Sequence, residues 1–467
     1  MAHTGCKCGV SIWNGYGPGG VNWDIFPMEL FRKEAYDNPE MELYDLICLI
    51  EDKYQNGDFH DFWLCRRCKR IQIWKMDGLY VSYKPVRWDH TPDLNTILGM
   101  EEWMAINDYD WECSAEPFTA VYLLEHPCRP FRYFMSGDKT KIYVYNSSTE
   151  QIEWVYEEEC RELEKGKYRD AHGIYTHKYE MRNGHNYYAG SVYEDGTELA
   201  DKNRNGDLSD AVYGAILGDT LGRAYTGMKK GTFKCTGMNG TKTSPAGAWS
   251  LSIGLMLATA KSLKDNDLTV NIDDLADRYR DCMNNTGIFS ETEKLQGEVR
   301  RDEYDAGSLL RVLPLAFAEC TDDEVVKVCE ILNDSASVAE ACVIFTGLIR
   351  KYLTQDRSQG DVKGITAIIR NFVEAEGIRG EDNAAEGSVT QILSSAFRVF
   401  LETDEYPKYE YEDCLKEAVN LGGNASAASA ASAVTGALAG LRYSYDSIPD
   451  DWTWKIRNNM LIQDCLF

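Results

Sequence analysis

The sequence predicts a multidomain protein, in which an α+β N-terminal region precedes an all-α C-terminal domain. Three observations carry this prediction: the length of 467 residues, the hydrophobic content of 44% and a change of pattern near residue 205. The length favours more than one domain, because a domain commonly holds about 100–200 residues. Before residue 205, short aromatic-rich runs alternate with turn residues. After it, apolar residues recur at helical spacing.

In the N-terminal half, two aromatic-rich runs are typical of a β-hairpin. Residues 142–145 and 152–156 are separated by Asn146, Ser147 and Ser148, residue types that favour turns. We expect a zinc-ribbon-like module over residues 1–80, and a β-rich α+β region with a linker over residues 81–205. The many aromatic side chains of this half either fill a β-rich core or form an exposed surface for a protein partner.

Four cysteines near the N-terminus have a spacing that suits a structural zinc site. They form two short pairs, Cys6 with Cys8 and Cys65 with Cys68. Four thiolates can hold zinc tetrahedrally, and such a closed site has no open position for catalysis. The first pair has one spacer residue where two are usual, so buried thiols without a metal stay an alternative.

The charge and the cysteine usage restrict the partners and the compartment. With 75 acidic and 49 basic side chains, the formal charge of −26 repels phosphate backbones, so we expect no nucleic-acid partner. The sequence suggests no signal peptide and no apolar run long enough to cross a membrane. Scattered cysteines without an export signal are typical of reduced thiols. We therefore expect a cytoplasmic protein that does not enter a membrane.

The C-terminal half begins after a polar stretch, residues 201–207. This stretch opens like a calcium loop, but its twelfth position is Val212, where an acidic side chain should close the metal shell. We therefore expect a linker that leads into a helix. Helical spacing predicts further helices over residues 250–264, 309–320, 338–353 and 391–401. The small residues of 425–441 predict a buried helix that approaches its neighbours closely.

Several motifs of this half follow one another in a specific order. They are the small-residue helix 210–222, the turn 245–249, the segments 306–316 and 418–423, the run 435–440, residues 446–449 and Trp452. From about residue 207 to the C-terminus, this pattern resembles the ADP-ribosylglycohydrolase family, typified by the dinitrogen-reductase-activating glycohydrolases. The resemblance implies an all-α, orthogonally packed domain with a cleft for ADP-ribose.

The resemblance also implies a two-magnesium mechanism, and here the chain departs from the family. The family's metal ligands are a Ser/Thr-Asp-Asp after the tryptophan, an Asp-x-Asp-Thr after the Gly-Gly and a Glu after the Gly-Asp-x-x-Gly. Only the first hydroxyl is kept, as Ser250; the other positions are Leu251, Ser252, Asn424, Ser426, Ala427 and Thr226. Without carboxylates, nothing compensates the dehydration of two dications. We therefore expect no magnesium, and we assign no catalytic residue.

The cleft that the resemblance implies would keep hydrogen-bonding groups and one aromatic ring. Its expected ligand-binding residues are Asp219, Ser250, Ser252, Tyr304, Gly307, Ser308, Asn424 and Ser426. We expect this degenerate protein to bind ADP-ribose or a related nucleotide as a sensor or sequestering protein. The diphosphate would lie on backbone N–H groups of helix starts after Gly218 and Gly307. Two alternatives stay open: an active glycohydrolase that removes ADP-ribose from a modified target, and a zinc-ribbon adaptor with a scaffold-only helical domain.

Overall fold

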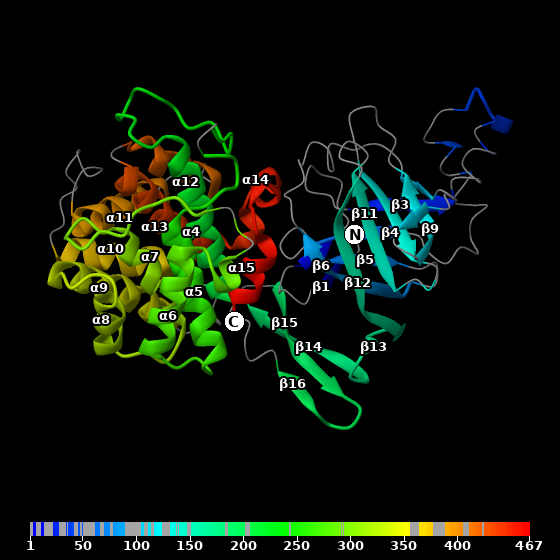
Figure 1. Cartoon of the computed structure of the whole chain (residues 1–467), viewed down its shortest axis with the longest axis horizontal. Helices are drawn as coiled ribbons and strands as arrows, with labels where there is room; N and C mark the ends of the chain where they lie inside the picture. Colours follow the sequence, from blue (N-terminus) through cyan, green and yellow to red (C-terminus); the bar gives the residue numbers. More distant parts are fainter. Residues whose placement is uncertain are drawn as a thin grey trace. The chain divides into compact units, whose positions relative to one another are not determined.

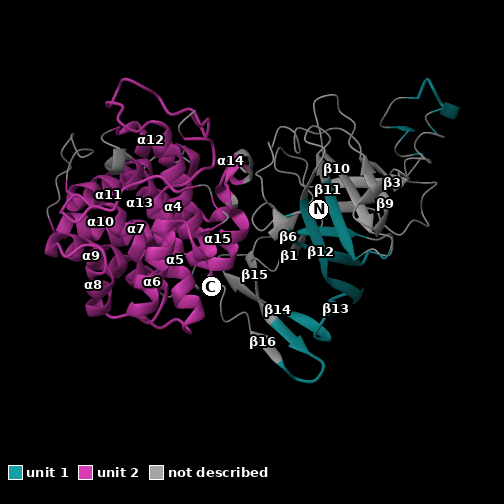
Figure 2. Ribbon diagram, in the orientation of Figure 1, with its two compact units in different colours: residues 1–181, 186–202 teal, residues 182–185, 203–467 magenta. Residues whose placement is uncertain are grey.

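The computed structural model divides the chain into two compact units, which Figures 1 and 2 show. Unit 1 holds residues 1–181 and 186–202, and unit 2 holds residues 182–185 and 203–467. In unit 2 the structure describes residues 206–241, 244–290, 292, 294–354, 364–376, 388–404, 411–422 and 425–467. In unit 1 it describes residues 151–181 and 186–200, the earlier strands, and residues 34, 36–41, 45, 46, 49, 65, 70, 78, 79, 138 and 140; residues 182 and 185, which end β14 and begin β15, are described as well.

Unit 1 is built on β-strands. A pair of strands, β1 (His3–Gly5) and β2 (Ser11–Trp13), forms a small sheet. The large sheet contains β3 (Asn22–Pro27), β4 (Asp61–Leu64), β5 (Ile71–Trp74), β6 (Tyr80–Trp88), β7 (Met104–Ile106), β8 (Trp111–Cys113), β9 (Glu116–Leu123), β10 (Phe131–Ser136), β11 (Lys141–Asn146), β12 (Gln151–Glu164), β13 (Lys167–Arg169), β14 (Ile174–Arg182), β15 (His185–Tyr193) and β16 (Glu198–Ala200). Because β5 pairs with β6 and β6 with β12, one sheet includes strands on both sides of residue 80.

The expected hairpin is confirmed. Strands β11 and β12 are antiparallel, and Tyr143 lies opposite Val155. The aromatic residues whose side chains are described pack inward at several positions. Tyr168, Tyr175 and Tyr193 gather around Tyr80, and the rings of Tyr175 and Tyr193 lie 5.2 Å apart between centroids. These aromatics therefore form a core.

Unit 2 is helical, as expected. Its helices are α4 (Gly206–Ala224), α5 (Leu251–Asp265), α6 (Ile272–Asn284), α7 (Gly307–Val312), α8 (Asp322–Glu330), α9 (Ala336–Leu353), α10 (Gly364–Ala375), α11 (Val389–Asp404), α12 (Tyr411–Asn420), α13 (Ala425–Tyr443), α14 (Asp450–Lys455) and α15 (Asn459–Cys465). The expected helix over 309–320 is shorter. It gives way to a 3-10 turn at Leu313–Phe317, because Pro314 has no N–H to continue the α-helical ladder. Within the described helices, none combines the length and the apolar character that crossing a membrane requires.

The helices α4 and α13 approach each other at backbone distance. A Cβ placed on Gly218 would lie 2.0 Å from the carbonyl oxygen of Ser432, and one on Gly436 would lie 2.1 Å from that of Gly214. Only glycine fits at these positions. The expectation of a buried small-residue helix at 425–441 is thus confirmed by α13, whose residues Ala430 to Leu441 are buried.

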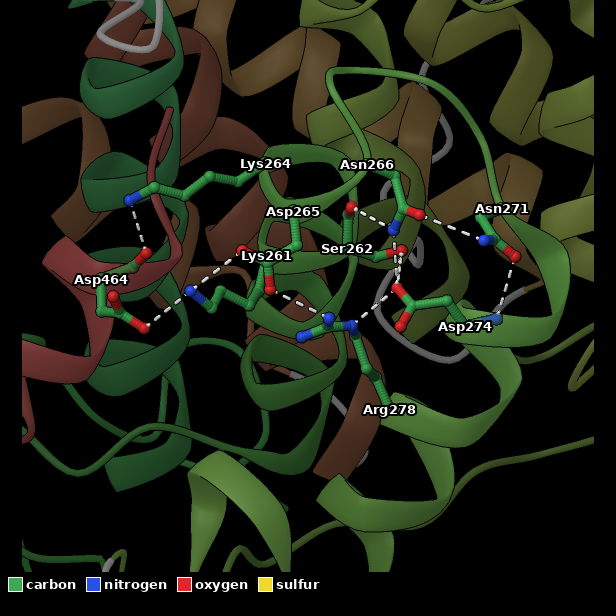
Figure 3. Close-up of polar contacts among 9 residues, drawn as sticks. All are labelled: Lys261, Ser262, Lys264, Asp265, Asn266, Asn271, Asp274, Arg278 and Asp464. Atoms are coloured by element: carbon green, nitrogen blue, oxygen red, sulfur yellow. Dashed lines mark hydrogen bonds and ion pairs between the residues drawn. The ribbon is translucent and has the colours of Figure 1, made fainter.

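A polar network fixes the C-terminal end of α5, as Figure 3 shows. Lys261 of α5 contacts Asp265 at 3.2 Å and Asp464 of α15 at 3.1 Å. On the other side, Arg278 of α6 contacts Asp274 at 2.7 Å and Asp265 at 2.9 Å. Three helices are therefore tied together at this end, while the opposite end of α5 begins at the candidate site.

Candidate functional site

The buried carboxylate of Asp219 links three helices at the start of α5. Asp219 lies on α4 and is 1% exposed. Its oxygens accept hydrogen bonds from the Ser250 backbone N–H at 2.7 Å, from the Ser250 hydroxyl at 2.8 Å and from the Ser429 hydroxyl of α13. Ser250 is the N-cap of α5, so this carboxylate also lies at the positive end of a helix dipole.

Opposing effects act on the pKa of Asp219. Burial raises it above the ordinary aspartate value, while the Arg223 charge and the hydrogen bonds from Ser429 and Ser250 lower it, and the net direction is upward. A carboxylate offers about four lone-pair positions, and three are used by protein donors. Asp219 thus acts first as a structural link between helices.

The first turn of α5 meets the start of α7. A Cβ added to Gly307 would lie 2.7 Å from the Ser252 hydroxyl oxygen, so these two expected site residues are brought together. Beside them, Leu251 is only 9% exposed, and its N–H donates to the Gln296 carbonyl at 2.9 Å. The apolar side chain of Leu251, where the family resemblance implies a carboxylate, therefore lies beside Gly297.

A buried ion pair supports the start of α7. Asp305 accepts from the Ser308 hydroxyl at 2.8 Å and from the Arg311 guanidinium at 2.5 Å, and Arg311 is 1% exposed. Asn333 donates to the Asp302 carbonyl at 2.9 Å and so fixes the preceding loop. Asp305, Arg311 and Asn333 were not among the residues expected from the sequence. The signal was an arginine inside the apolar run 309–313, which indicates a buried counter-ion.

Tyr304 follows that loop and is 40% exposed. The Arg300 guanidinium lies 5.5 Å from the centroid of its ring, a distance at which a cation is attracted to an aromatic face. Tyr304 therefore presents an accessible ring beside the Asp305 network. Of the remaining expected residues, Asn424 lies outside the described residues, and Ser426 is placed on α13 without a described side chain.

Of the two helix starts expected to bind a diphosphate, one does not exist, and the N–H groups of the other already donate to backbone carbonyls. No helix starts after Gly218, because this residue lies inside the continuous helix α4. Helix α7 does start at Gly307, but the Ser308 and Leu309 N–H groups donate to the carbonyls of Asp305 and Ala306 at 3.1 and 3.3 Å. A diphosphate would need other donors.

The described residues do not fit magnesium. The donors at the start of α5 are two hydroxyls and a carboxylate that protein donors already engage, whereas magnesium needs near-octahedral anionic oxygens. Among the described parts of both units, no three His, Cys, Asp or Glu side chains gather closely enough to hold a metal ion. Of the four expected zinc ligands, Cys65 is described and buried; Cys6, Cys8 and Cys68 lie outside the described residues.

Comparison with known proteins gives a family match for unit 2. The family model for ADP-ribosylglycohydrolase matches residues 201–466. Among solved structures, an "ADP-ribosylglycohydrolase-related protein complex" is similar, with a TM-score of 0.44 and 23% identity over 56% of this chain and 95% of that one. Among curated proteins, none matches the sequence.

Proposed function

The chain belongs to the ADP-ribosylglycohydrolase family, and from this premise we propose that it binds ADP-ribose or a related nucleotide without metal-dependent hydrolysis. One observation carries the proposal. At the start of α5, Leu251 stands where the family resemblance implies a carboxylate and lies beside Gly297, and Asp219 accepts hydrogen bonds from Ser250 and Ser429. The role that fits such a protein is to sense or sequester the nucleotide.

The neutral groups that stay at this site can still recognise a nucleotide. The Ser252 hydroxyl lies beside Gly307, and the Tyr304 ring is accessible. Stacking of a base on an aromatic ring contributes about 1–2 kcal/mol. We therefore propose that Tyr304 stacks on the base and that Ser252 forms a hydrogen bond with a sugar hydroxyl.

Calorimetric titration of the full chain with ADP-ribose tests this proposal. Tyr304→Ala should weaken binding about tenfold, which corresponds to about 1.4 kcal/mol. Tyr304→Phe is the matched control: it keeps the ring and should bind within about twofold of the parent. No heat with ADP-ribose at millimolar concentration would instead favour the adaptor with a scaffold-only helical domain.

We also propose that Cys6, Cys8, Cys65 and Cys68 hold a structural zinc in unit 1. The support is the position of Cys65 directly after β4, where its N–H donates at 2.8 Å to the carbonyl of Arg70, the residue before β5. Zinc bound by thiolates would cross-link this part of the chain to the N-terminus. The stabilised N-terminal half would then offer a surface to a protein partner.

A further inference from the structure

Two buried cysteines are neighbours where α8 packs against α9 (Figure 1). Cys329 belongs to the last turn of α8, and Cys342 lies on α9; the side chains of both are buried. The Cys342 thiol forms a hydrogen bond with the sulfur of Cys329, so the two side chains meet between the helices. Both residues are free thiols in the structure. Two thiols in contact can be joined by a disulfide, which an isolated buried cysteine cannot form.

The surroundings make the two thiols chemically unequal. The hydrogen bond from Cys342 and the charge of the buried Arg311 guanidinium of α7 lower the pKa of Cys329. These effects outweigh burial and the carboxylates of Asp305 and Glu330, which raise the same pKa. Burial raises the pKa of Cys342 well above the ordinary cysteine value. Because the thiolate is the nucleophilic form of cysteine, Cys329 is the reactive member of the pair and Cys342 is its protonated neighbour.

The reactive cysteine lies at the end of a short helix. Cys329 is the residue before the last one of α8, which has nine residues. Its carbonyl accepts hydrogen bonds from the N–H groups of Leu332 at 3.1 Å and Asn333 at 2.9 Å, in the turn that leads to α9. Helix ends open locally at a lower free-energy cost than the middle of a packed helix. A small oxidant can therefore reach Cys329 through local opening of this turn, without global unfolding.

We propose that Cys329 and Cys342 form a reversible disulfide when the protein meets hydrogen peroxide. The Cys329 thiolate attacks one peroxide oxygen: an S–O bond forms, the O–O bond breaks, and the leaving hydroxide takes up a proton to become water. The Cys342 sulfur then attacks the sulfur of this sulfenic acid: the S–S bond forms, the S–O bond breaks, and a second water leaves with the Cys342 proton. Two thiols are oxidised by two electrons, and one peroxide is reduced to two waters. This modification site goes beyond nucleotide binding and does not depend on it.

Peptide mapping of the full chain tests the proposal directly. Trypsin cleaves after Lys327 and Arg350, so residues 328–350 form one peptide that contains Cys329, Cys342 and no other cysteine. The folded protein is treated with hydrogen peroxide, and the remaining thiols are then alkylated in denaturant. The peptide 328–350 should carry no alkyl group and should weigh two hydrogens less than its reduced form. Reduction before alkylation should restore both thiols, because a disulfide is reversible.

Cys320 provides an internal comparison in the same digest. It is the cysteine of the preceding tryptic peptide, residues 312–327, and it is less buried than Cys329. Burial nevertheless raises the pKa of Cys320 to about 11, so little of it is thiolate at neutral pH. If exposure alone decided the rate, Cys320 would be oxidised first. We expect the opposite order, with the thiols of peptide 328–350 lost at least about twofold faster than that of Cys320.

Serine variants test the role of each sulfur. In Cys342→Ser, oxidation of Cys329 should stop at the sulfenic acid, which dimedone traps, whereas in Cys329→Ser the Cys342 thiol should stay reduced. Cys414→Ser, the same change at a buried cysteine of α12, is the matched control and should leave the disulfide yield unchanged.

The measurement on the parent chain does not depend on the folding of any variant. Two alkyl groups on peptide 328–350 at a peroxide dose that oxidises Cys320 would overturn the proposal. A disulfide from Cys329 to any cysteine other than Cys342 would overturn it as well.

Discussion

The backbone contact between α4 and α13 predicts that one substitution, glycine to alanine, has opposite effects at two helical positions. A Cβ on Gly436 would lie 2.1 Å from the Gly214 carbonyl oxygen, whereas ordinary contact begins at 3.4 Å. The helices would have to separate by at least 1.3 Å, the difference between these two distances. On α9, a Cβ on Gly347 meets nothing within 4 Å.

The magnitudes follow from this geometry. Overpacking a core costs about 1–3 kcal/mol, and we expect about 3 kcal/mol here because the opposing atoms belong to the backbone. Alanine returns about 1 kcal/mol of helix propensity, so Gly436→Ala should lower the free energy of unfolding by about 2 kcal/mol. Gly347→Ala should raise it by about 1 kcal/mol.

Urea denaturation of the full chain, followed by helical circular dichroism, measures both effects. The midpoint of the transition of unit 2 should fall for Gly436→Ala and rise for Gly347→Ala, with an unchanged slope. A Gly436→Ala variant as stable as the parent would refute the backbone contact. That result would also leave the hydrogen bond between Asp219 of α4 and Ser429 of α13 without an explanation, because this bond requires the two helices to lie close together.

Restoring the family's metal ligands together should create magnesium affinity that the parent lacks, because a two-metal site needs most of its ligands at once. The substitutions are Thr226→Glu, Leu251→Asp, Ser252→Asp, Asn424→Asp, Ser426→Asp and Ala427→Thr. Each single substitution should have little effect, and a single one that creates the affinity would contradict this prediction. Burial raises the pKa of Asp274, but hydrogen bonds from Arg278, Ser262 and Asn266 outweigh it and lower the pKa. The stability that this carboxylate adds is therefore present above its unfolded pKa and is lost as the pH falls through the lower folded pKa. The difference in unfolding free energy between the parent and Asp274→Asn should accordingly shrink below about pH 4. A difference that stays constant in urea titrations at several pH values would disprove this. Elemental analysis should find about one zinc per chain, and Cys65→Ser should abolish it; a zinc-free parent would rule out the proposed cysteine site.

Local sequence patterns predicted the longest described helices of unit 2. The expected ranges 338–353 and 391–401 correspond to α9 and α11, and 250–264 corresponds to α5, because apolar periodicity reports directly on a buried helix face. The helix predicted over 309–320 was too long, because apolar periodicity does not take into account that Pro314 has no N–H to donate. The expectation that a helix starts after Gly218 was wrong, because this glycine allows the close contact with α13 and does not interrupt α4.

The sequence suggested residues for a site but not their contacts. The order of motifs led to Asp219, Ser250 and Gly307 as expected site residues. The partner that fixes Asp219, however, is Ser429, which is 210 residues away in the chain. The ion pair between Asp305 and Arg311 was also missed, because its effect depends on burial, and a sequence pattern does not state burial for a single charged residue.

We propose above all that this family member binds its nucleotide without magnesium and without turnover. The most direct measurement is calorimetric titration with ADP-ribose after treatment with a chelator and again in excess magnesium, with release of ADP-ribose from an ADP-ribosylated protein followed in the same samples. We expect the same affinity in both conditions and no released ADP-ribose. Binding that appears only with magnesium, or release that the chelator abolishes, would contradict it.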